Sequence, residues 1–478
     1  MTNLSGVNLN NGAAVGPQGE GRESPSSFPK YPAYKSSGVE WLGEVPEHWA
    51  VIALKWLSPV FRGASPRPID DPIYFDDDGE FGWVRIADVT ASPDGYLYET
   101  TQRLSALGSS LSVKLEPGEL FLSIAGSVGK PCITAVKACI HDGFVYFPWL
   151  SIDQRLLYRV FESGLCFGGL GKMGTQLNLN TDTVGGICIA VPPAAELSRA
   201  LAFLDHETAR IDALIEEQQR LIELLKEKRQ AVISHAVTKG LDPTVPMKDS
   251  GVEWLGEVPE HWESLTLGRV ASSVKTGGTP SDDLPSADII DGVEWYTPGD
   301  FTGDLLLDSS EKRVSAGAVR SGNAKVFPSG SVLIVSIGAT LGKVGHIRRP
   351  ASANQKINAV VPGPRVDGYF LAYSLSVKVN AMRFLSNAST IGIMNQEKTK
   401  EIWLSLPPLQ EQKLITEFLD KQTSVIDTLI QEAAGGVALL QERRSALISA
   451  AVTGKIDVRG WQPPANTQAP KLEVAEAN

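Results

Sequence analysis

One stretch of thirteen residues occurs twice in this chain. The sequence SGVEWLGEVPEHW runs from Ser37 to Trp49 and recurs unchanged from Ser250 to Trp262, an offset of 213 residues. A second matched pair ends each copy, since residues 192–242 resemble residues 407–457 at an offset of 215. Two long copies cannot form a solenoid, which needs several short repeats to bury a continuous core. The sequence therefore predicts a pseudo-twofold tandem duplication.

The two ends of the chain lie outside the repeat. The head, residues 1–36, is rich in Gly, Asn, Ser and Pro, and the tail, residues 461–478, has few large apolar residues. Such segments bury too little apolar surface to offset the conformational entropy lost on ordering. We expect both to be disordered.

The first part of each copy has the pattern of an α+β domain. In residues 37–190 and 250–405, Gly and Pro separate short runs of β-branched and aromatic residues, such as Leu120–Ile124 and Val332–Ile337. Runs of this length between turn residues are typical of strands. We expect one globular domain in each of these two ranges.

The second part of each copy has the pattern of a long helix. After a double proline, about 40 residues follow without Pro and with a seven-residue apolar period, which predicts helices within 191–240 and 406–457. Such a period keeps one seam facing a partner helix, so we expect the two helices to pair. The alternative, that each helix lies only on its own domain, stays open. The seam residues are Leu204, Ile211, Leu225 and Val232 in the first helix and Leu419, Ile426, Leu440 and Leu447 in the second.

The second helix departs from the first at one place. Ala433–Gly436 stands where the first copy has Gln218–Leu221. Each helical Gly costs about 1 kcal/mol relative to Ala. We expect the second helix to bend there, or to be closely approached by another segment.

A few positions match between the otherwise diverged domains. Arg62–Pro66 matches Thr276–Pro280, and a small-residue turn that ends in Lys130 matches one that ends in Lys343. Backbone amides on such a turn and the ammonium beside it could both face a phosphate. The alternative, a solvated tight turn, is equally compatible with the sequence.

Carboxamides stand near these turns, and they are of the kind that binds adenine bidentately. Loop carboxamides are common, so each also has an ordinary structural interpretation. The candidate DNA contacts are Arg62, Lys130, Gln176, Asn178 and Asn180 in the first copy, and Lys343, Asn354, Gln355, Lys356, Asn395 and Gln396 in the second.

The sequence shows no constellation typical of catalysis. Neither turn lysine is followed by the Ser or Thr of a nucleotide-binding loop, and the histidines form no metalloprotease or nucleophile-base pattern. The cysteines lack metal-ligand or disulfide spacing. Phe167–Gly171 fits a methyl-donor loop by letter, but the second copy lacks it. We therefore expect no catalytic residue, no metal site and no cofactor in this chain, and we expect His48 and His261 to pack or to cap.

Charge and hydropathy constrain the surroundings of the chain. A formal net charge of −11 argues against a generally adhesive polycation, but it does not exclude DNA, because binding depends on local grooves. No window approaches the roughly 20 apolar residues of a membrane helix, and the first 35 residues lack a signal-peptide pattern. We expect a cytoplasmic protein without a membrane partner.

Taken together, these features resemble the specificity subunit of type I DNA restriction-modification systems. The resemblance extends over residues 37–457 and rests on the two repeated openings and on matching helix motifs. Those residues are Trp41–Trp49, Trp254–Trp262, Phe203–Asp205, Ile211–Asp212, Leu214–Ile215, Phe418–Asp420, Ile426–Asp427 and Leu429–Ile430.

The resemblance implies an architecture and a set of partners. The fold would be two α+β target-recognition domains separated by an antiparallel pair of long coiled-coil helices, and each domain would read one half of a split, asymmetric site in double-stranded DNA. Two modification subunits would bring S-adenosylmethionine and methylate adenine, and restriction subunits would add ATP- and Mg-dependent cleavage. Divergence of the two copies suits such a target, because identical domains on a twofold axis would read a palindrome.

Two points stay open from the sequence. His141–Gly143 stands where the second copy has Asn354–Lys356, so base contacts cannot be transferred from one domain to the other. A different class of protein, a non-DNA scaffold with two ligand-binding domains on a coiled-coil spacer, would share the same repeat. DNA affinity distinguishes the two.

Overall fold

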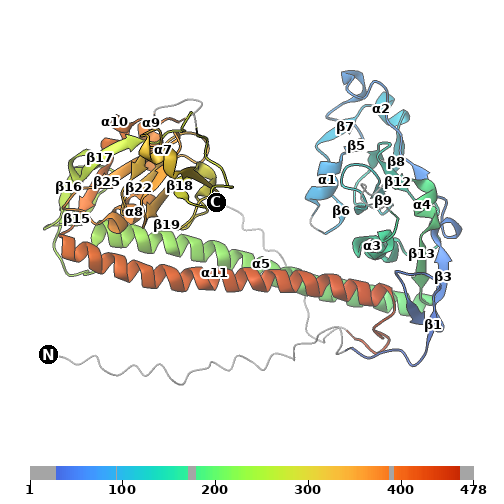
Figure 1. Ribbon diagram of the computed structural model, residues 1–478. Helices are drawn as coiled ribbons and strands as arrows, with labels where there is room; N and C mark the ends of the chain where they lie inside the picture. Colours follow the sequence, from blue (N-terminus) through green and yellow to red (C-terminus); the bar gives the residue numbers. More distant parts are fainter. Residues whose placement is uncertain (1–27, 93, 171–178, 282, 387–391, 463–478) are drawn as a thin grey trace. The chain divides into compact units, whose positions relative to one another are not determined.

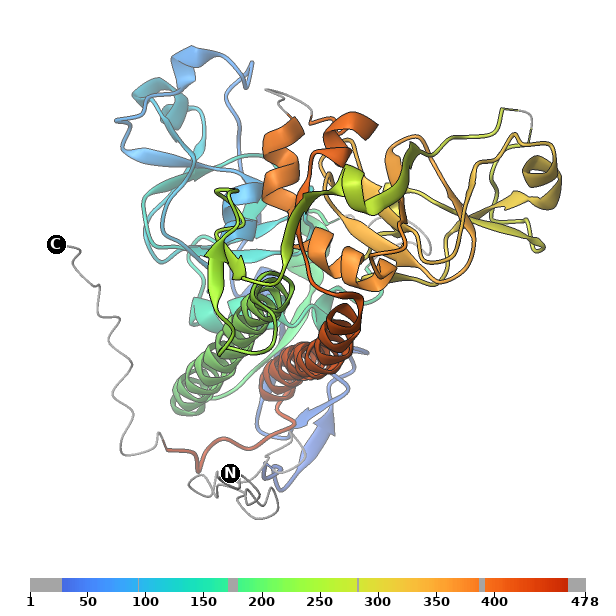
Figure 2. The same ribbon diagram turned by 90° about the vertical axis from the view of Figure 1, so that its left-hand side faces the viewer.

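The computed structural model describes residues 28–462, apart from 93, 171–178, 282 and 387–391. By contact density the chain divides into two compact units. The first comprises the described parts of 1–217 and 436–478, and the second comprises 218–435. Each unit contains one α+β domain and a portion of both long helices, α5 and α11 (Figures 1 and 2).

The domain of the first unit is built on two small sheets. One has the strand order β4-β12-β9-β10-β6 and the other β7-β5-β11-β8, and two-stranded ribbons pair β1 with β2 and β3 with β13. Its strands are β1 (Tyr34–Ser36), β2 (Glu44–Pro46), β3 (Ala50–Ala53), β4 (Phe61–Arg62), β5 (Phe81–Val84), β6 (Tyr96–Leu97), β7 (Gln102–Leu104), β8 (Val113–Leu115), β9 (Leu120–Ser123), β10 (Pro131–Thr134), β11 (Ala138–Ile140), β12 (Phe144–Tyr146) and β13 (Cys188–Val191). Its helices are α1 (Ile86–Ala91), α2 (Ala106–Ser110), α3 (Gln154–Glu162) and α4 (Thr181–Gly186).

The second unit repeats this topology. Its sheets have the orders β17-β25-β22-β23-β19 and β20-β18-β24-β21, with ribbons β14-β15 and β16-β26. Its strands are β14 (Met247–Asp249), β15 (Glu257–Pro259), β16 (Glu263–Thr266), β17 (Ala271–Thr276), β18 (Gly292–Tyr296), β19 (Leu306–Leu307), β20 (Lys312–Ser315), β21 (Val326–Phe327), β22 (Val332–Val335), β23 (Val344–Ile347), β24 (Ala351–Ala353), β25 (Ile357–Pro362) and β26 (Trp403–Leu406). Its helices are α6 (Leu267–Val270), α7 (Ala316–Arg320), α8 (Gly368–Ser376), α9 (Val379–Ser386) and α10 (Gln396–Lys400). The predicted duplication of an α+β domain is confirmed.

The central strands β9 and β22 explain why these segments read as continuous apolar runs. All four residues of each strand are buried. Leu120 and Leu122 join the core that the domain shares with its helices, whereas Phe121 joins the core between the sheets. A strand places alternate side chains on opposite faces, so a strand with two covered faces is apolar at every position.

The two long helices are α5 (Ala194–Lys239) and α11 (Leu409–Val452), each inside its predicted range. In the first unit, Leu204, Ile211 and Leu447 are buried, and Leu440 is half-buried. These residues pack on one another and on the domain, so the predicted pairing of the two helices is confirmed there, and the alternative that each helix lies only on its own domain is wrong.

In the second unit the helix portions pair in the same way. Leu419 and Ile426 are buried, and Leu225 and Val232 are half-buried. Arg229 of α5 donates to Asp427 of α11 over 2.8 Å. In the first unit the equivalent residues make the same contact with the helices exchanged. There Arg444 of α11 donates to Asp212 of α5 over 2.7 Å. The same ion pair therefore closes the predicted helix pair in both units.

A carboxylate in the first turn of each long helix binds the repeated Pro-Glu-His-Trp turn. Glu196 of α5 accepts from the indole of Trp49 over 2.8 Å and lies 2.8 Å from the imidazole of His48. Burial opposes ionisation of Glu196, but hydrogen bonds from Tyr31, His48 and Trp49 outweigh it and lower its pKa. Glu411 of α11 binds the second copy of the turn through the same two residue types. The predicted packing role of the turn is confirmed.

Part of the head is folded, which corrects the prediction of disorder for residues 28–36. Tyr31 is 4% exposed, its hydroxyl donates to Glu196 over 2.5 Å, and its aromatic ring packs edge-to-face on the Trp49 indole. At the other end, Trp461 packs edge-to-face on Phe203, so the predicted tail begins in an ordered contact. Residues 1–27 and 463–478 lie outside the described part.

The paired glycines of the second helix, Gly435 and Gly436, lie in an unbroken α11. A Cβ atom at either position would meet no described atom within 4 Å. The close approach expected at this point is therefore not found among the described residues.

Candidate nucleic-acid interface

In the first unit the matched loop after β4 is pressed against the turn between β11 and β12. The amide of Gly63 donates to Phe144 over 2.9 Å, and that of Ala64 donates to Ile140 over 3.1 Å. A Cβ atom on Gly63 would lie 2.2 Å from the carbonyl oxygen of His141. Gly63 is thus required for close approach of two backbone segments rather than for a left-handed conformation.

The second unit builds the same loop cluster. The amide of Gly277 donates to Ile357 over 2.9 Å, and that of Gly278 donates to Ala353 over 2.8 Å. A Cβ atom on Gly277 would lie 2.2 Å from the Ala353 carbonyl oxygen. Both units therefore hold their matched loop rigidly at the same end of the five-stranded sheet.

The side chains on the first loop cluster form a small charged network. Asp142 accepts from the Ser65 hydroxyl over 2.9 Å and from the Arg67 guanidinium over 3.0 Å, and its carbonyl oxygen accepts from Arg62. Partial burial opposes ionisation, but these donors prevail and lower the pKa of the Asp142 carboxyl group. Burial lowers the pKa of the His141 imidazole, and the positive charge of the exposed Arg85 lowers it further. The exposed charge of the cluster is mainly positive.

The second cluster presents amides and lysines instead. The Thr279 hydroxyl donates to the Gln355 side-chain oxygen over 2.7 Å, and Gln355 and Lys356 are exposed. The Gln396 carboxamide lies 3.1 Å from the Thr276 hydroxyl, which brings the start of α10 to the same cluster. The predicted residues Gln355, Lys356 and Gln396 are therefore neighbours of one loop.

Three predicted carboxamides are used within the chain. Asn180 and Asn395 are the N-caps of α4 and α10, and each accepts from the backbone amide three residues on, over 2.8 Å. Asn354 is buried and accepts from the amide of Lys356 over 2.9 Å. These contacts satisfy the side-chain oxygens locally, as caps and turns require.

The two turn lysines differ. Lys130 is exposed, and its turn contains Gly126 and Gly129 at positive φ. Lys343 donates to the carbonyl of Phe301 over 2.7 Å and lines a cavity of about 200 Å³. Phosphate contact by either lysine stays a prediction. The candidates Gln176 and Asn178 lie outside the described residues.

Sequence reasoning missed Ser65, Arg67, Arg85, Asp142 and Thr279. Ser65 and Thr279 stand inside the matched loops, so the signal was a hydroxyl at the same place in both copies. Their partners lie 77 and 76 residues further along the chain, and no local pattern links them.

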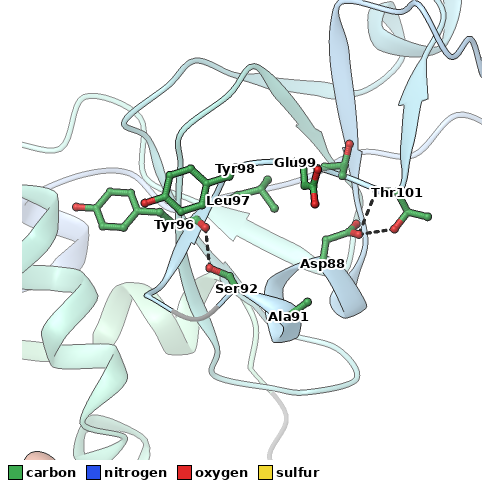
Figure 3. A pocket seen from close by; sticks show the side chains of 9 residues that line it. Asp88, Ala91, Ser92, Tyr96, Leu97, Tyr98, Glu99 and Thr101 are labelled. Carbon is green, nitrogen blue, oxygen red and sulfur yellow. Dashed lines mark hydrogen bonds between the residues drawn. The ribbon is translucent and has the colours of Figure 1, made fainter. Parts of the chain in front are cut away.

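The larger of the described cavities does not belong to this cluster. It measures about 410 Å³ in the first unit, beside α1 and β6, and Figure 3 shows Asp88, Glu99 and Tyr98 among its lining residues. Asp88 accepts from the Thr101 hydroxyl over 2.7 Å and also caps α1. Asp88 and Glu99 carry negative charge into the lining of this cavity, so it does not favour a phosphate, which is also negative.

Two further findings concern the ranges that the structure describes. No three His, Cys, Asp or Glu side chains in them are gathered closely enough to hold a metal ion. None of their helices combines the length and the apolarity needed to cross a bilayer.

Comparisons with known proteins place this fold. Residues 259–433 match the model of the type I restriction modification DNA specificity domain. The chain is 25% identical over 209 residues to the EcoR124I/EcoR124II specificity subunit of Escherichia coli, a match that spans 42% of this chain and 48% of that relative. It is 23% identical to the putative MjaX specificity subunit of Methanocaldococcus jannaschii over 87% of this chain and 96% of the relative.

Among solved structures, a chain from a study of complex assembly and conformational transition of the type I R-M system has the same fold. It superposes with a TM-score of 0.67 at 18% identity and covers 85% of this chain and 98% of its own length. The duplicated domains and the two long helices of this chain agree with the fold of that solved structure. The chain is therefore similar to the specificity subunits of type I restriction-modification systems, and its residues 259–433 match their DNA specificity domain.

Proposed function

We propose that this chain is the DNA-reading subunit of a type I restriction-modification complex and is not catalytic by itself. The observation that carries the proposal is the loop cluster, which is built twice on the same backbone with different exposed side chains. The first cluster exposes Arg62, Arg67 and Arg85, and the second exposes Gln355 and Lys356. Arginine, lysine and carboxamide side chains are those that contact phosphates and base edges.

Each unit would read one half of a split, asymmetric site in double-stranded DNA, because the two clusters present different chemistry. Two modification subunits would bind the chain and methylate adenine with S-adenosylmethionine. Restriction subunits with ATP and Mg would add cleavage. These cofactors belong to the partners in this proposal.

The test is single-molecule sequencing of adenine methylation in cells that carry this gene with its neighbouring genes. A second strain carries the gene without residues 263–405. We expect a split methylated motif only with the intact gene. An unchanged motif in the deletion strain would contradict the proposal, and so would the absence of methylation when all subunits are detected by immunoblot. In the second case the scaffold alternative gains support.

A further inference from the structure

The loop clusters of the two units are closed by the same hydroxyl contact. Ser65 donates to Asp142 over 2.9 Å in the first unit, and Thr279 donates to Gln355 over 2.7 Å in the second. Asp142 and Gln355 are equivalent positions, 213 residues apart in the repeat. We call this hydroxyl contact, Ser65–Asp142 in the first unit and Thr279–Gln355 in the second, the bracket. The tight backbone packing around Gly63 and its counterpart Gly277 fixes the bracket in both units.

The residue that accepts the hydroxyl hydrogen bond is the charged Asp142 in the first unit and the neutral Gln355 in the second. This difference changes which side chains the cluster exposes. The second carboxylate oxygen of Asp142 accepts from Arg67, and its main-chain carbonyl oxygen accepts from Arg62. The side chain of Arg67 is nevertheless 71% exposed, so most of its N–H donors remain free for another partner. In the first unit the bracketed residue therefore positions two guanidinium groups.

In the second unit the bracketed residue is itself the exposed group. The Thr279 hydroxyl occupies one lone pair of the Gln355 oxygen, which fixes the orientation of the amide. No described residue accepts from the Gln355 amide nitrogen. The cluster thus offers two N–H donors and one remaining acceptor site on a single side chain.

We propose that position 142/355 determines the base specificity of each unit, an inference that rests on the proposed function. A guanidinium matches the O6 and N7 acceptors of guanine, whereas a carboxamide matches the N6 donor and N7 acceptor of adenine. Asp142 is a positioning residue that acts through Arg67 and Arg62. Gln355 is a contact residue.

The experiment changes each bracket without changing its size. Asp142→Asn keeps an acceptor for Ser65 and the main-chain contact to Arg62, but removes the carboxylate charge that holds Arg67. Gln355→Glu removes the N–H donors and leaves acceptors, which suit the N4 amino group of cytosine. Each variant replaces the wild-type gene in the methylating strain, and the motif is determined by single-molecule sequencing. Glu44→Gln, an exposed acid of the first unit, is the matched control.

We expect the two variants to change different halves of the motif. Asp142→Asn should reduce discrimination at one guanine by about tenfold or more, and Gln355→Glu should do so at one adenine of the other half. The control should leave both halves unchanged. Unchanged motifs in both variants, or an equal loss of methylation at both halves in a variant that still co-purifies with the modification subunits, would overturn the inference. A wild-type strain without a split motif would instead overturn the proposed function.

Discussion

At the scale of single residues, Lys378 is a buried cation between α8 and α9. It is 7% exposed, and burial lowers the pKa of its ammonium to about 8. The unfolded chain keeps this proton up to about pH 10.5, so stability rises with pH between about 8 and 10.5. We predict that Lys378→Met increases the free energy of unfolding at pH 7 by about 2 kcal/mol. Most of the gain should disappear at pH 10.

Chemical denaturation at both pH values measures this effect. Lys413→Met, at an exposed position of α11, removes the same charge and serves as the control. An equal gain for Lys378→Met at pH 7 and pH 10 would show that apolar packing, rather than the buried charge, is responsible.

At the scale of elements, the paired glycines of α11 weaken a helix that has room for side chains. A Cβ atom at Gly435 or Gly436 meets nothing within 4 Å. Because alanine restricts the unfolded chain and suits a helix, the double variant Gly435→Ala, Gly436→Ala should stabilise the isolated chain by about 1–2 kcal/mol. Gly240 has φ +78° after α5, so Gly240→Ala should lower the midpoint of thermal unfolding. A lowered midpoint for the double variant would refute this account.

The elements also show what could be predicted from sequence. The helices and their seam were readable because a seven-residue period persists over many turns. The folded segment around Tyr31, residues 28–36, could not be predicted. One buried ring among Gly and Pro leaves a local composition that is typical of disorder. Asn180 precedes Thr183, with which it forms a reciprocal cap, and that local signal was available. The bracket between Ser65 and Asp142 depends on tertiary packing, which no local pattern encodes.

At the scale of the whole chain, the described ends occupy the place of an internal connection. The amide of Asp457 donates to Pro29 over 2.7 Å, and Phe28 and Trp461 both pack on Phe203. In the second unit one continuous segment, residues 240–249, occupies the equivalent sequence positions.

A circular permutant tests this equivalence. Joining Gln462 to Phe28 through about six Gly and Ser residues, with new ends opened between Pro243 and Thr244, should preserve the thermal midpoint within a few degrees. The methylated motif should also be retained. Opening the chain inside β22 is the control that should abolish folding, because all four residues of that strand are buried. A permutant that unfolds at room temperature would contradict the equivalence.

The division of the long helices between the units affects the order in which the chain can fold during synthesis. The second unit is one uninterrupted stretch, whereas the core of the first includes Leu447 and Ile448, which the ribosome adds among the last described residues. Nascent domains usually fold from the N-terminus onward. We therefore expect the first domain to be translated to complete its core, and to cover the surface around Leu204, only after the second unit has been synthesised.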